Sequence, residues 1–120
     1  MTATRTTIPL PVHAAIETVA APAIMAAPLL LGFGEAAGVT AFVIGALLLG
    51  LALQTVGPRR TIPLSAHAGF DYTLAAIATV TGLVVGIVTG EWAQGSFLVG
   101  VGVAQVALTA STRFSVPAGV

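Results

Sequence analysis

The chain has 120 residues, of which 57% are hydrophobic and only 7% are charged, and its formal net charge is zero. Soluble domains carry about 25% charged residues, so this composition excludes a soluble globular enzyme, a disordered tail and a nucleic-acid-binding protein. Cysteine is absent, which also excludes disulfides and thiolate metal sites. The remaining class is an integral membrane protein whose main contact is the lipid bilayer.

Four apolar segments are each long enough to cross a membrane, because about 20 helical residues span about 30 Å of hydrocarbon. We expect the spans at about 9–31, 35–56, 63–88 and 93–112. Thr7 and Thr61 are expected to cap the first and third helices. Glycine-containing breaks at 32–34 and 89–91 separate the helices of each pair, and a Gly-Pro break at 57–58 separates the two pairs.

The second half of the chain repeats the first. The segment 7–17, TIPLPVHAAIE, aligns with 61–71, TIPLSAHAGFD, and the similarity continues after one inserted residue to Leu53 and Leu108. The sequence therefore predicts an all-α membrane protein of two tandem two-helix hairpins, 1–57 and 58–120, in one integral membrane domain. Because each hairpin returns the chain to its starting side, a pseudo-twofold axis along the membrane normal should relate them.

The distribution of charge predicts the orientation. All basic residues fall at the chain ends and between the hairpins: Arg5, Arg59, Arg60 and Arg113. The two opposite tips carry Glu35 and Glu91 and no basic residue. The positive-inside rule then places the N- and C-termini in the cytoplasm.

Each repeat also carries a histidine and an acid four residues apart inside a predicted span: His13 with Glu17, and His67 with Asp71. Residues at this spacing share one helix face. Gln105 of the fourth span lies at a similar depth, so the pseudo-twofold axis is expected to gather these side chains into one polar cluster. Two further polar residues are expected near it, Thr18 and Tyr72.

Carboxylates in the membrane cost about 2.5 kcal/mol or more near the helix centre, so they usually face the protein interior and have partners. The simplest interpretation is structural: each histidine bonds the carboxylate on its own helix and helps to lock the hairpins together. Imidazole and carboxylate are also normal metal ligands, which makes His13 and His67 candidate ligands of a metal ion or axial ligands of a haem. A proton or small-solute relay is the remaining alternative, and the cofactor is left unknown.

Small residues recur at helical spacing on three spans, which permits close helix packing within the bundle or, alternatively, contact with another chain. They are Gly82, Gly86 and Gly90 on the third span, Ala37, Ala41 and Gly45 on the second, and Ser96, Gly100 and Ala104 on the fourth.

The segment 28–33, PLLLGF, resembles the motif of the SPW-repeat membrane proteins, in which Ser-Pro-Trp is often followed by Leu-Gly-Phe. Here Ala27 stands in place of Ser and Leu29 in place of Trp, and the second repeat has Thr81-Gly82-Leu83 at the corresponding place. The resemblance implies duplicated two-helix units in the plasma (inner) membrane of a prokaryote. It implies no known activity.

No hydrolase, phosphate-loop, zinc-protease or dinucleotide-binding motif occurs in the sequence. We therefore expect no enzyme. The first functional hypothesis is a structural or accessory subunit, or a homo-oligomeric scaffold, within a larger membrane complex. The second is an intramembrane metal, haem or transport protein that uses the duplicated His-x-x-x-acid pairs.

Overall fold

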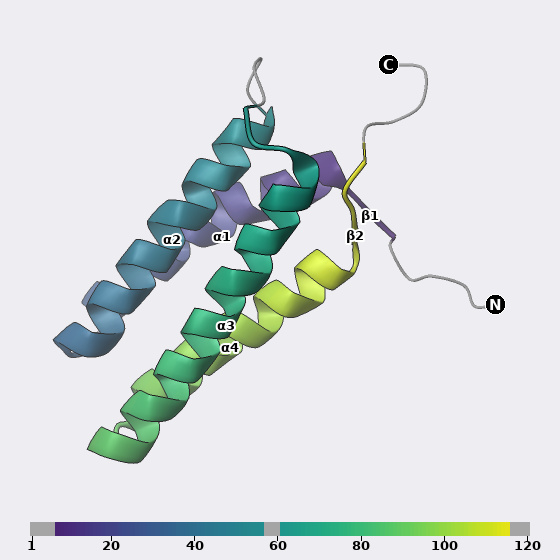
Figure 1. Cartoon of the computed structure of the whole chain (residues 1–120). Helices are drawn as coiled ribbons and strands as arrows, with labels where there is room; N and C mark the ends of the chain where they lie inside the picture. The colour runs from purple at the N-terminus through teal and green to yellow at the C-terminus, as the bar shows by residue number, and fades with distance from the viewer. Residues whose placement is uncertain (1–6, 57–60, 116–120) are drawn as a thin grey trace.

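The computed structural model describes residues 7–56 and 61–115, and within them four long helices and two short strands are formed (Figure 1). The elements are β1 (Ile8–Pro9), α1 (Leu10–Leu31), α2 (Glu35–Val56), α3 (Leu64–Thr89), α4 (Trp92–Ala110) and β2 (Thr112–Arg113). All four helices are long and apolar enough to cross a membrane. The predicted spans are confirmed to within two residues at each end. The predicted boundary at 57–58 lies outside the described residues.

The helix starts differ from the prediction. The residues at the N-caps of α1 and α3 are Pro9 and Pro63, and neither makes a side-chain capping bond. The predicted caps at Thr7 and Thr61 are therefore wrong, because both threonines lie two residues before the cap position. Thr61 instead accepts a 2.6 Å hydrogen bond from the side-chain amide of Gln54.

Two glycines end the first helix of each pair. Gly32 and Gly90 have φ angles of 70° and 76°, in the left-handed region that costs glycine nothing. Their backbone N–H groups donate to the carbonyls of Pro28 and Gly86, four residues earlier. Each of these hydrogen bonds gives a partner to a carbonyl at the end of the helix. The left-handed backbone of the glycine turns the chain towards the next helix. Gly90 is thus a helix terminator and not part of a packing surface.

The helices pack in two pairs, α1 with α2 and α3 with α4, and α2 joins the pairs through α3 (Figure 1). The core between the pairs is apolar and contains several small side chains. Its fully buried members are Ala21, Ile44, Leu48, Leu51, Leu74 and Ala78.

The distribution of side chains is the reverse of that in a soluble protein. Large apolar residues face outward, with Leu30 84% and Val19 76% exposed, whereas His13 and Asp71 are completely buried. A hydrocarbon solvent explains both observations, because lipid accommodates exposed leucine and valine but excludes ionisable groups. The fold therefore supports a multi-pass membrane protein.

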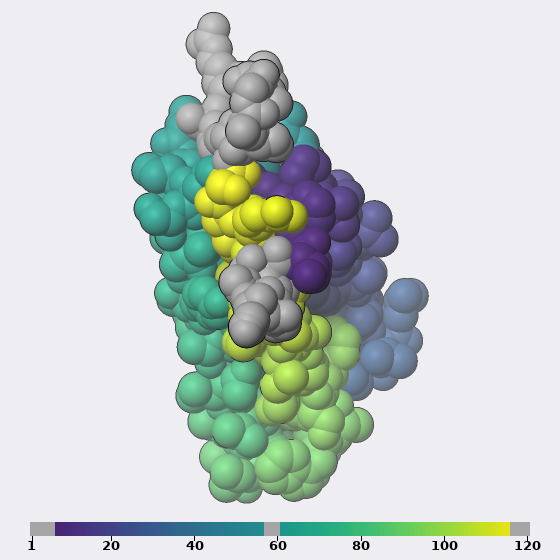
Figure 2. Space-filling model, turned by 90° about the vertical axis from the view of Figure 1, so that its right-hand side faces the viewer, coloured from purple at the N-terminus to yellow at the C-terminus, as the bar shows by residue number. Residues whose placement is uncertain are grey.

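A short parallel pairing of β1 with β2 joins the two ends of the described chain, and sequence analysis missed it. Ile8 lies opposite Thr112 and Pro9 opposite Arg113, and the N–H of Ile8 donates to the carbonyl of Ser111 at 3.0 Å. Figure 2 shows the N-terminal residues against the C-terminal strand at this end of the molecule. The pairing holds the start of α1 close to the end of α4.

Candidate functional site

The four ionisable residues predicted inside the spans come together at one place. His13 and Glu17 come from α1, and His67 and Asp71 come from α3. All four are at most 2% exposed. One potential ligand atom from each residue can be chosen so that all four atoms lie within 4.8 Å of one another. The structure thus assembles one cluster from both hairpins, as the duplicated spacing predicts.

The shortest of the four histidine–carboxylate contacts crosses between the hairpins. His13 Nε2 lies 3.0 Å from Asp71 Oδ2 and 3.2 Å from Glu17 Oε2 on its own helix. His67 Nε2 lies 3.3 Å from Asp71 Oδ2 and 3.6 Å from Glu17 Oε1. Simple pairing of each histidine with its own helix therefore describes only half of the contacts. The cluster also links α1 to α3.

Helix α4 contributes to the same cluster from its last two turns. Gln105 Nε2 donates to Glu17 Oε2 at 2.8 Å, which places Gln105 where its depth predicts. Thr109, one turn later, donates to Asp71 Oδ2 at 3.5 Å and accepts from Gln105 Nε2 at 3.2 Å. Thr109 was missed, although its spacing of four from Gln105 puts both residues on one helix face.

Two further threonines contact the far side of the histidine rings. Thr112 Oγ1 lies 2.7 Å from His13 Nδ1, and Thr55 Oγ1 lies 3.0 Å from His67 Nδ1. The sequence pattern predicts neither contact. Thr112 has no local signal, because its position depends on the end of α4 and on the β1–β2 pairing.

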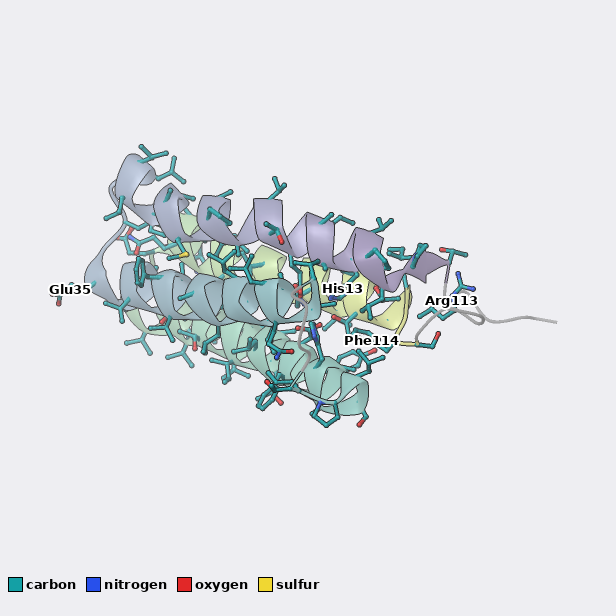
Figure 3. The ribbon with its side chains drawn as sticks, turned by 90° about the horizontal axis from the view of Figure 1, so that it is seen from above. His13, Glu35, Arg113 and Phe114 are labelled. Atoms are coloured by element: carbon teal, nitrogen blue, oxygen red, sulfur yellow. The ribbon has the colours of Figure 1, made fainter. Side chains whose placement is uncertain are left out.

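An aromatic ring covers the cluster on the side of the chain ends. The Phe114 ring centroid lies 5.1 Å from that of His13 and 5.5 Å from that of His67. In Figure 3, His13 lies inside the bundle and Phe114 lies towards the end marked by Arg113. The ring therefore separates both imidazoles from that end of the molecule.

Two residues expected near the cluster lie elsewhere. Thr18 donates its hydroxyl to the Ala14 carbonyl at 2.7 Å, within its own helix. Tyr72 is 43% exposed on the outer face of α3. The prediction that they join the cluster is wrong. Each follows an acidic residue by one position, so its side chain points away from the helix face that carries the acid.

Three buried atoms of the cluster have no hydrogen-bond partner among residues 7–56 and 61–115: Glu17 Oε1, His67 Nε2 and Asp71 Oδ1. A buried polar group without a partner costs about 1–3 kcal/mol, and more when it is charged. These unpartnered atoms lie on residues that already approach one another. This arrangement leaves three polar atoms of the cluster for which a further polar species would be a partner.

Some of the residues predicted to pack between helices do so, and others do not. A Cβ atom on Gly82 would lie 2.6 Å from the Gly95 carbonyl oxygen, and one on Gly45 would lie 2.9 Å from that of Ala21, so both positions require glycine. Ala41 is completely buried, and Gly86 packs directly against the Trp92 ring.

The fourth helix uses a different face from the predicted one. Gly100 is exposed, and a Cβ atom there would meet nothing within 4 Å. Within the chain, α4 packs through Gly95 and Gly102 instead. The prediction that Gly100 packs inside the bundle is therefore wrong. Ser96 and Ala104, on the same row, are exposed as well.

The charges at the two ends of the bundle are separated as predicted where the structure describes them. Glu35 and Arg113 lie at opposite ends in Figure 3. Arg5, Arg59 and Arg60 lie outside the described residues. The side of the membrane on which each end lies stays a prediction.

Comparison of the chain with protein-family models, curated proteins and solved structures finds no match. The resemblance to the SPW-repeat proteins therefore stays a prediction.

Proposed function

We propose that this chain is a four-span membrane protein that binds one divalent transition-metal ion between its two hairpins. The ligands are His13, Glu17, His67 and Asp71. The observation that carries the proposal is the convergence of these buried groups, with three of their polar atoms left without partners. A cation among the four side chains gives those atoms a partner and offsets the charge of the two carboxylates.

The spacing of the donor atoms supports tetrahedral coordination. Bonds of about 2.0–2.2 Å to a tetrahedral zinc ion require donor atoms about 3.3–3.6 Å apart. The four imidazole–carboxylate distances range from 3.0 to 3.6 Å, although Glu17 offers a different oxygen to each histidine, and one donor atom from each residue lies within 4.8 Å of the others. Side-chain rotation must therefore bring the most distant donor atoms about 1 Å closer together, from 4.8 Å to about 3.6 Å, to close a tetrahedral shell around the ion.

The ligand types favour some metals over others. Imidazole suits zinc and other late first-row metals, whereas magnesium and calcium prefer oxygen ligands alone. Haem fits poorly, because carboxylate oxygens lie 3.0–3.6 Å from the Nε2 atoms of both histidines, in the space that a porphyrin ring would need. Four protein ligands fill a tetrahedral shell and leave no open position for substrate, so we propose a non-enzymatic role.

The proposal includes the architecture in the membrane. Each hairpin supplies one histidine and one carboxylate, which supports a tandem duplication with a pseudo-twofold axis through the cluster. The distribution of arginine supports cytoplasmic termini. The prokaryotic inner membrane rests on the family resemblance alone.

Metal analysis of the purified chain in mild detergent tests the proposal. We expect about one equivalent of a transition metal after loading with zinc and desalting. Asp71→Asn should abolish retention, and Glu35→Gln is the matched control because Glu35 lies at the far end of the bundle. A chain that retains no metal, or an Asp71→Asn variant that retains as much as Glu35→Gln, would overturn the proposal.

A second candidate role is the homo-oligomeric scaffold or accessory subunit. The supporting observation is the exposed row Ser96, Gly100 and Ala104 on α4, in which a Cβ atom on Gly100 would meet nothing within 4 Å among the described residues. Small residues at this spacing let a helix of another chain approach closely. Native mass spectrometry of the wild type and Gly100→Leu tests it: a mass that stays monomeric for both counts against the scaffold role.

A further inference from the structure

The orientation of the two histidines in the cluster is set from outside it. A neutral imidazole carries its proton on one ring nitrogen and a lone pair on the other, and the hydrogen bond made by one nitrogen decides the role of the other. Both rings direct Nε2 at the carboxylates and Nδ1 at a threonine hydroxyl. The threonines therefore decide which nitrogen has the lone pair.

Thr112 has only one proton to donate, and the structure assigns it to the helix backbone. Its hydroxyl donates to the Leu108 carbonyl at 2.6 Å. The same oxygen lies 2.7 Å from His13 Nδ1, so it must accept a hydrogen bond from that nitrogen. Nδ1 of His13 is thus an N–H group.

Thr55 acts on the other ring in the same way. Its hydroxyl donates to the Leu51 carbonyl at 2.9 Å, and its oxygen lies 3.0 Å from His67 Nδ1. Nδ1 of His67 is therefore an N–H group as well. Its Nε2 has no hydrogen-bond partner. Nε2 can face carboxylate oxygens in two ways: as an N–H donor of a protonated ring, or, in the neutral ring, with its lone pair on a cation that lies between. The second arrangement is that of a metal ligand.

We propose that Thr55 and Thr112 are positioning residues that hold both histidines as Nδ1-protonated tautomers, with the Nε2 lone pairs available to the metal ion. This inference rests on the proposed function. Metal-ligating histidines generally donate their second N–H to such a partner, and loss of the partner typically lowers metal affinity by about 10- to 100-fold.

The two positioning contacts are supplied crosswise between the hairpins. Thr55, on α2, orients the histidine of the second hairpin, and Thr112, on β2, orients that of the first. Each histidine therefore becomes a ligand with the correct tautomer only when the two hairpins are docked. The docked arrangement binds the ion, and neither hairpin alone presents a finished ligand set.

The experiment measures zinc affinity by competition with a chromogenic chelator for the full chain in detergent. Thr55→Val and Thr112→Val should each lose about 10- to 100-fold in affinity. Thr55→Ser and Thr112→Ser restore the hydroxyl and should bind within a few-fold of the wild type. Thr73→Val is the matched control, because Thr73 makes the same bond to the carbonyl four residues earlier but on an exposed face.

Nitrogen-15 NMR of the imidazoles gives a readout that a general loss of stability does not produce. The chain has two histidines, so both rings can be assigned with point variants. In the zinc-loaded wild type we expect both rings to show a protonated Nδ1 and a metal-bound Nε2. Coordination through Nδ1 in either ring would overturn the inference. This readout uses the wild type, so it remains decisive when a valine variant is too unstable for an affinity measurement.

The outcomes separate the inference from the proposed function. If the wild type binds no zinc, the proposed function fails and the positioning role falls with it. If the wild type binds zinc and both valine variants bind as tightly as Thr73→Val, the positioning role alone is overturned.

Discussion

Asp71 Oδ2 makes more polar contacts than any other atom of the cluster. It lies 3.0 Å from His13 Nε2 and 3.3 Å from His67 Nε2, and it accepts a hydrogen bond from Thr109. One oxygen thus links α1, α3 and α4. Glu17 contacts the two histidines through different oxygens, His13 through Oε2 and His67 through Oε1.

Gln105 holds the Glu17 carboxylate from α4, and its removal should weaken metal binding without removing a ligand. Gln105→Ala should lower zinc affinity by about tenfold, the lower end of the usual range for groups that orient a ligand. Chelator competition measures the effect. Gln94→Ala is the control, because the Gln94 side chain bonds the exposed backbone of Gly34. Equal affinities for the two variants would contradict the assigned role of Gln105.

Two glycines on α4 provide a matched pair for the packing surface. In Gly95→Ala the new methyl group would lie 2.6 Å from the backbone oxygen of Gly82, so α3 and α4 must separate. Such overpacking typically costs about 1–3 kcal/mol. Gly100→Ala meets nothing and should leave stability unchanged or slightly raised. Thermal unfolding in one detergent compares them, and a Gly100→Ala variant that is less stable than Gly95→Ala would contradict the described packing.

At the scale of single residues, the sequence predicts a site only where periodicity carries the information. His13 and Asp71 are recognisable because ionisable groups are costly in an apolar span and because the repeat duplicates them. Thr55 is not recognisable, because threonine is tolerated in apolar helices. Thr112 is not recognisable, because it lies beyond α4 and its partner His13 is 99 residues away in the sequence. Gly100 and Gly95 both belong to small-residue rows, and only the rotation of α4 decides which row packs.

At the scale of elements, the β1–β2 pairing closes the cluster end of the bundle. Two-residue strands have no detectable alternation, so sequence patterns do not predict them. The pairing brings Thr112 to the His13 ring and is followed directly by Phe114. The ends of α1 and α4 are therefore held by backbone contacts as well as by the polar side chains.

A disulfide cross-link tests the pairing, since the natural chain contains no cysteine. Pro9 and Arg113 are register partners, so Pro9→Cys/Arg113→Cys should oxidise to an intramolecular disulfide. Faster gel mobility that is reversed by reductant measures it. The control is Glu35→Cys/Arg113→Cys, whose positions lie at opposite ends of the bundle (Figure 3). Cross-linking of the control as efficiently as the paired variant would argue against the described register.

At the scale of the whole molecule, the lengths and apolar character of the four helices follow from the sequence, because hydrocarbon thickness sets both. Their pairing as α1–α2 and α3–α4 follows from the short connections within each pair. The contact between the pairs does not follow from these features. It depends on where the polar faces of α1 and α3 meet, and the repeat indicates this contact only if the hairpins are assumed to be related by a twofold axis.

Orientation in the membrane can be tested with single cysteines and an impermeant maleimide. Gly34→Cys, beside the Glu35 tip, should react in intact cells, and Ser115→Cys should react only after lysis, because the arginine-bearing ends are expected inside. Gel shifts of the labelled chain measure both reactions. The reverse pattern would show that the termini face outward, and labelling of both positions in intact cells would contradict a single fixed orientation.

Removal of the proposed metal ion should destabilise the whole chain. A ligand that binds only the folded state stabilises it by about 2.7 kcal/mol when present at 100 times its dissociation constant. Treatment with a strong chelator should therefore lower the melting temperature of the wild type. Asp71→Asn should melt at the same temperature with and without chelator. A wild type whose melting temperature does not respond to added zinc or chelator would contradict a metal bound only by the folded state.

The division of the cluster between two hairpins has a consequence for biosynthesis. The first hairpin leaves the ribosome before the second and enters the bilayer with His13 and Glu17 still lacking the partners that α3 and α4 provide. Exposure of such groups to hydrocarbon costs about 2.5–3.5 kcal/mol each on insertion scales. The position of the pair within the first two turns of α1 reduces this cost, since those turns can stay in the headgroup region until the second hairpin arrives. Completed insertion of α1 and docking of the second hairpin are then one event.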